Sequence, residues 1–138
     1  AGGQHGVQNE ANLHRGLLRQ AVVFQADALI HFGTHGSLLV DIRKSFFGTS
    51  PRLVISDFEA LASSSSIAAF DVTPVDNWYS AALDSAGYPY INLTRTTQFR
   101  LRFATDDNNN LFADYMMFYS GNAVAALRPQ LIVTYYIP

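Results

Sequence analysis

The chain has 138 residues, of which 49% are hydrophobic and 14% are charged, and its net charge at pH 7 is −2. This length and composition predict one globular domain with a single core and exclude a disordered chain. A weakly acidic chain with one lysine argues against nucleic-acid binding, and no apolar run approaches the roughly 20 residues of a membrane-spanning helix.

The front of the chain divides into two parts. Residues 1–16 are polar and glycine-rich without a periodic pattern, which predicts a flexible arm. Residues 17–32 are apolar in short bursts, and this pattern favours one long or two short strands over a helix. The predicted organisation is therefore an arm over 1–16 followed by one domain over 17–138.

Short strand-like runs separated by turn residues continue through the middle of the chain. Residues 37–43 alternate as a half-buried strand does, and 52–56 form a second short run of strand formers. Residues 57–66 predict a brief helical turn with Asp57 as its N-cap and the serine run as its exit. Residues 67–72 then return to a strand.

The second half of the chain repeats this pattern. Residues 77–83 and 90–94 are predicted strands joined by a turn that contains Gly and Pro. Residues 113–120 are rich in aromatic side chains, and 128–137 close the chain with β-branched and aromatic residues. Many short strands at turn-punctuated spacing predict an all-β fold, either an antiparallel β-sandwich or a jelly roll.

Two predicted strands alternate so regularly that each should have one buried and one solvated face. In 37–43, Asp41 lies on the face opposite to Leu38, Val40 and Ile42. In 98–103 both arginines are predicted to point to solvent, and the inward side chains are Phe99, Leu101 and Phe103. With Trp78 and either Ile132 or its neighbours Leu131 and Val133, these three side chains form the predicted core.

Six blocks occur in order between residues 34 and 138: THGSLLVDIRK, PVDNWYSAAL, YPYINLT, TQFRLRFATDDNN, ADYMMFYSGN and RPQLIVTYYIP. Together they resemble the C-terminal portion of the DNRLRE-type β-sandwich domains. Domains of that family occur in secreted and cell-surface proteins of bacteria and archaea, and they are similar to jelly-roll carbohydrate-binding modules. The resemblance implies a non-catalytic module that is secreted and located at the cell surface.

The sequence departs from that family at its front, where such domains usually carry further strands and only 17–32 is strand-like here. Either the sandwich is short, the sequence is a fragment, or a strand comes from elsewhere. An incomplete edge exposes N–H and C=O groups that a segment of a neighbouring copy can pair with. Residues 1–32 are therefore expected to form subunit contacts in a filament, unless 17–32 pairs within its own domain. The contact residues expected are Val22, Val23, Phe24, Leu29 and Ile30.

One acidic and amide-rich segment resembles a calcium loop in its spacing. Asp106, Asn108, Asn110 and Asp114 occupy relative positions 1, 3, 5 and 9 of such a loop. However, Leu111 and Met117 stand where that loop needs its glycine and its bidentate glutamate. Because Asp and Asn also favour turns, 106–110 is predicted to be a surface turn between two antiparallel strands, with calcium as the alternative and no other cofactor.

The remaining function classes are an enzyme and a carbohydrate-binding module. The chain has no cysteine, no nucleophile elbow, no metalloprotease helix and no phosphate loop, so we predict that it is not an enzyme. Trp78, Tyr88 and Tyr90 are candidates for stacking on sugars, although sandwich cores use the same side chains. The predicted function is a structural or adhesive module that contacts copies of itself, and the alternative is a module that binds polysaccharide.

Overall fold

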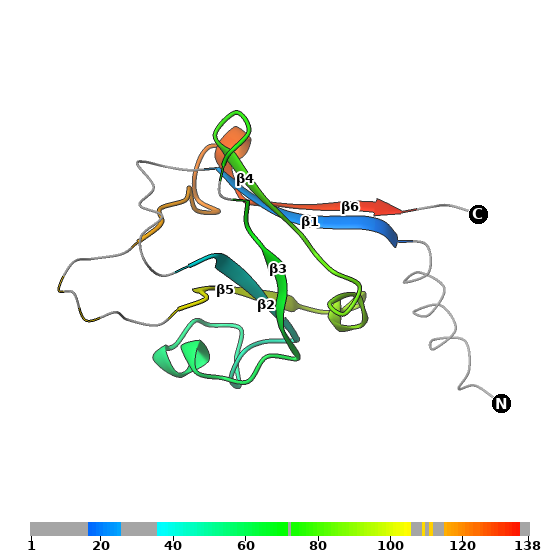
Figure 1. Ribbon diagram of the computed structural model, residues 1–138. Coiled ribbons are helices and arrows are strands. Elements are labelled where there is room, and N and C mark those ends of the chain that lie inside the picture. The colour runs from blue at the N-terminus through cyan, green and yellow to red at the C-terminus, as the bar shows by residue number, and fades with distance from the viewer. Residues whose placement is uncertain are drawn as a thin grey trace.

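The computed structural model describes residues 17–25, 36–71, 73–105, 109, 111 and 115–135. Strands in this part of the chain form two antiparallel three-stranded sheets (Figure 1). The first sheet has the order β4–β1–β6, with the strands Trp78–Ala82, Leu17–Gln25 and Gln130–Tyr135. The second sheet has the order β3–β2–β5, with the strands Ser64–Ala69, Leu38–Lys44 and Thr97–Phe103.

Short 3-10 helices connect several of these strands: η1 covers Ile55–Phe58, η2 covers Tyr88–Tyr90 and η3 covers Ala125–Leu127. The predicted all-β, antiparallel fold is therefore confirmed. The more detailed prediction of a sandwich or jelly roll with an incomplete front edge stays a prediction.

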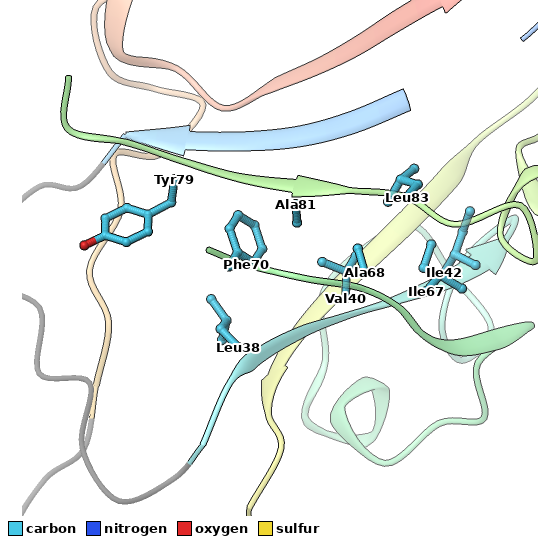
Figure 2. Packing of buried hydrophobic residues seen from close by; sticks show 9 residues of the cluster. All are labelled: Leu38, Val40, Ile42, Ile67, Ala68, Phe70, Tyr79, Ala81 and Leu83. Atoms are coloured by element: carbon cyan, nitrogen blue, oxygen red, sulfur yellow. The ribbon is translucent and has the colours of Figure 1, made fainter. Parts of the chain in front are cut away.

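The core lies where β4 of the first sheet faces β2 and β3 of the second (Figure 2). Alternate residues of each strand point into it because successive side chains of a strand point to opposite faces. The strand β4 and the residue after it contribute Tyr79, Ala81 and Leu83. The second sheet and its adjoining loop contribute Leu38, Val40, Ile42, Ile67, Ala68 and Phe70.

The periphery of the core differs in part from the prediction. Phe99, Leu101 and Phe103 pack against the core but remain half-buried, as does Trp78. The predicted burial of residues 131–133 is wrong, because all three side chains of this stretch of β6 are exposed. Residues 115–120 lie outside the six strands, and the ring of Phe118 instead packs 6.0 Å from that of Phe70.

Two predicted strands are absent, and local hydrogen bonds of polar side chains explain both cases. Residues 52–54 lead instead into η1, which begins at Ile55, and Asp57 Oδ2 accepts a hydrogen bond of 2.9 Å from the N–H of Val54. Residues 90–94 form a turn, because Asn92 Oδ1 accepts hydrogen bonds from the N–H groups of Thr94 and Arg95. Asp57 is therefore the third residue of η1 and not its predicted N-cap.

The serine run is also placed differently, since Ser64 begins β3 and the strand ends at Ala69. The predictions for 37–43, 77–83, 98–103 and 128–137 are confirmed within one or two residues at the described ends, by β2, β4, β5 and β6.

Gly48 is expected to be the glycine least tolerant of substitution in the segment that joins β2 to η1. Its φ of +70° is a conformation that side chains disfavour, and a Cβ there would collide with Asp57 Oδ1. Gly48→Ala should therefore lower the free energy of unfolding by about 1–3 kcal/mol, measured by urea denaturation. Gly121→Ala is the control, because a Cβ at Gly121 meets nothing within 4 Å. An equal loss in both variants would contradict this explanation.

Candidate interaction surface

An ionic cluster of Asp41, Arg100 and Arg102 lies on the face of the second sheet that points away from the core. Asp41 on β2 is directly opposite Arg100 on β5, and its side chain has no exposed area. Its Oδ2 accepts hydrogen bonds from Arg100 Nη2 at 2.8 Å and from Arg102 Nε at 3.0 Å. Its Oδ1 accepts a hydrogen bond of 2.9 Å from the N–H of Ser66, at a register shift between β2 and β3.

The surroundings of Asp41 keep its carboxylate ionised. Burial by itself would raise the pKa of Asp41, because it disfavours the charged form. The hydrogen bonds from Arg100, Ser66 and Arg102, together with the charge of Arg102, outweigh burial and hold the pKa below its ordinary value. Both carboxylate oxygens are thus committed to hydrogen bonds that hold strands together, a structural role.

Arg100 also fixes the segment 47–60 over this outer face. Its Nη1 donates to the carbonyl oxygens of Asp57 at 3.0 Å, Phe58 at 2.9 Å and Ala60 at 2.7 Å. Its guanidinium carbon lies 4.5 Å from the centre of the Phe47 ring. The prediction that the arginines of β5 point to solvent is therefore wrong for Arg100, whose side chain is only 15% exposed, and Arg102 is bound to Asp41.

Among the described residues, β5 is an edge strand of the second sheet. Hydrogen bonds from Ser45 N to Thr96 O and from Ala104 N to Ser37 O flank its pairing with β2. Bonded pairs alternate along an antiparallel ladder, so the even-numbered residues of β5 bond to β2. The N–H and C=O groups of Phe99 and Leu101 consequently point away from β2, to the side where the described residues add no further strand.

A cavity adjoins this edge on each face of the sheet. The outer cavity, about 270 Å³, lies between β5 and the segment 47–58, and its apolar walls include Phe47, Leu53 and Phe58. The core-side cavity, about 220 Å³, is walled by Leu38, Phe103, Met116 and Phe118. Leu101 lines both, so apolar space is available on either face at the same point of the open edge.

The strand β6 is an edge strand of the first sheet and presents uncovered apolar side chains. Leu131, Ile132 and Val133 are 47%, 46% and 43% exposed. Because successive residues of a strand point to opposite faces, neither face of β6 is covered here. Figure 1 shows β6 beside β1, the one described strand with which it pairs.

The aromatic residues predicted to stack on sugars are not brought together. Trp78 begins β4, whereas Tyr88 and Tyr90 lie in η2, beyond the other end of that strand (Figure 1). Both tyrosines are half-buried against the core, and the hydroxyl of Tyr88 donates to the carbonyl oxygen of Leu83 at 3.4 Å. This arrangement gives no shared aromatic platform, and sugar binding stays a prediction.

The other predicted site residues fall partly outside the described residues. This applies to Asp106, Asn108, Asn110 and Asp114 of the calcium alternative, to the turn over 106–108 and 110, and to Leu29 and Ile30. Val22, Val23 and Phe24 lie in β1, the central strand of the first sheet, between β4 and β6. In the structure the backbone of 17–25 thus pairs within its own chain, which was the alternative to a role in subunit contacts.

The described residues contain no group of three or more His, Asp or Glu side chains that could hold a metal ion. No helix in this part of the chain is long and apolar enough to cross a membrane. The resemblance to the DNRLRE-type domains stays a prediction. Comparison with protein-family models, with curated proteins and with solved structures finds no match to this chain.

Proposed function

We propose that this chain is a non-catalytic structural module that acts by binding copies of itself, as part of an extracellular assembly at a cell surface. The observation that carries the proposal is the uncovered edge of β6, with apolar side chains on both faces. The extracellular setting is supported by the resemblance of the six sequence blocks to domains of cell-surface proteins.

An edge such as β6 favours association for two physical reasons. Edge strands offer unpaired N–H and C=O groups, and proteins that stay apart usually protect them with charges, prolines or short strands. The strand Gln130–Tyr135 contains none of these devices over its six residues. Covering its exposed aliphatic side chains would also remove apolar area from water, at about 25 cal/mol per Å².

A single contact through β6 should nevertheless be weak. Six residues of strand span roughly 20 Å, and the area they bury is below the roughly 1,200 Å² of the smallest stable interfaces. Self-association is therefore expected to depend steeply on protein concentration.

The double variant Leu131→Lys/Ile132→Lys is expected to weaken self-association about tenfold or more, measured by sedimentation velocity over a concentration series. Both positions are exposed, so the variant should fold, and it places a charge on each face of the contact strand. Val75→Lys is the matched control, because Val75 is an exposed aliphatic residue outside β6. A wild-type chain that is monomeric at every concentration would refute the proposal.

A further inference from the structure

The structure offers a specific partner for β6. We infer that the open edge of β5 receives the β6 strand of a second copy, so that copies join head to tail. This inference rests on the proposed function and adds to it the receiving surface and the geometry of assembly.

The receiving edge has both elements that strand addition requires. The N–H and C=O groups of Phe99 and Leu101 face the open side and can continue the ladder with an incoming strand. Alternate side chains of that strand would lie on opposite faces of the enlarged sheet. The outer cavity and the core-side cavity stand on those two faces beside Leu101, so the edge accepts consecutive apolar residues.

Among the four edge strands of the described sheets, β6 matches this requirement best. Its Leu131, Ile132 and Val133 are consecutive, apolar and exposed on both faces. The strand β4 has Tyr79 and Ala81 buried in the core, and the interior of β3 contains Ser66 with a φ of +55°. Neither of these strands presents a run of large exposed apolar side chains.

Charge also favours β6 of the second copy, rather than its β5, as the strand that pairs with the β5 edge. The ionic cluster carries two arginines against one aspartate, so two β5 edges placed together would bring like charges close. The residues of β6 are uncharged and bring no such repulsion.

The geometry of the assembly follows from the two edges belonging to different sheets. Each copy would give β6 from its first sheet and receive at β5 of its second sheet. Such a contact is heterologous, and it generates an open filament unless the rotation between copies closes a ring. Pairing of β6 with β6 about a two-fold axis would instead stop at a dimer and leave both cavities empty.

Mixing two variants that are each blocked at one edge tests the inference. The donor variant is Leu131→Lys/Ile132→Lys, and the acceptor variant is Leu53→Lys/Phe58→Lys, which places charge on the outer cavity wall. Leu53 and Phe58 are 76% and 62% exposed, so the acceptor variant should fold, as circular dichroism would verify. We expect neither variant to assemble alone and an equimolar mixture to form a 1:1 dimer by light scattering.

Cross-linking gives a second readout, since the chain has no cysteine of its own. Leu53→Cys/Ile132→Cys treated with a bifunctional maleimide should give a ladder of covalently cross-linked oligomers. Ile132→Cys alone should give no cross-linked species. An acceptor variant that associates like wild type, or dimers of Ile132→Cys alone, would overturn the inference and leave the proposed function standing. A monomeric wild type would refute both.

Discussion

Asp41→Ala is expected to lower the free energy of unfolding by about 3–5 kcal/mol, the cost of removing one partner from a buried ion pair. The substitution leaves the largely buried guanidinium of Arg100 without its carboxylate and removes the acceptor for the N–H of Ser66. It also weakens the hold of Arg100 on the segment 47–60. Urea denaturation at neutral pH measures the loss.

The matched control for this substitution is Asp71→Ala. Asp71 is exposed and accepts one side-chain hydrogen bond, from the hydroxyl of Ser80, so Asp71→Ala should lower the free energy of unfolding by about 1 kcal/mol or less. If Asp41→Ala and Asp71→Ala were equally stable, the ionic cluster would not hold the second sheet together.

The same cluster predicts how stability depends on pH. The pKa of Asp41 is lowered from 3.8 by folding, so the folded state favours the ionised form more than the unfolded state does. The stability that this preference contributes is fully present above pH 3.8 and is lost as the pH falls towards the lower pKa of the folded state. Asp41→Asn should therefore unfold with a shallower acid dependence than wild type between pH 5 and pH 2.

The sequence predicts the strands that alternate and pair, and it fails where local hydrogen bonding competes. The strands β2 and β5 follow from strict alternation, which needs no knowledge of neighbours. The runs 52–56 and 90–94 have strand-forming composition, but Asp57 and Asn92 offer the backbone other hydrogen bonds there. A composition of strand formers therefore does not establish a strand where no partner strand lies alongside.

The ionic cluster shows a different limit of sequence reasoning. An aspartate within the apolar run of β2 and two arginines in β5 are visible in the sequence, but their meeting depends on the register of two strands about 60 residues apart in the chain. Burial of the outer face depends further on the segment 47–60, which no periodic pattern assigns to that face. Alternation therefore predicts which side chains share a face, and tertiary structure decides whether that face is covered.

The location of the open edges shows the same limit. The sequence predicts an incomplete sheet and places the deficit at the front of the chain, yet β1 is a central strand with neighbours on both sides. The described open edges with apolar surroundings are those of β5 and β6, which come later in the chain. Strand order in space is not the order in sequence, so the order of strands along the chain does not give the position of an open edge, and the incomplete front edge stays a prediction.

Phe70→Ala is expected to destabilise the protein by about 3–5 kcal/mol, through lost transfer free energy and the cavity left behind. Phe70 is buried directly after β3, and its backbone N–H donates to the carbonyl oxygen of Leu38 on β2 at 2.9 Å. Its ring meets that of Phe118, which also lies 6.3 Å from the ring of Tyr79 on β4. Removal of the ring therefore opens the contact between the two sheets.

Phe58→Ala is the control for the loss of a phenyl ring by itself. Because Phe58 is exposed, this substitution should lower the free energy of unfolding by about 0.5 kcal/mol or less. Both variants are compared by thermal and urea denaturation at concentrations where the wild type is monomeric. Nearly equal stabilities would mean that the two sheets do not share the core seen in Figure 2. A large loss of unfolding free energy in Phe70→Ala but not in Phe58→Ala would show that the two sheets share one core within a single copy. The edges of β5 and β6 would then remain available for contacts between copies.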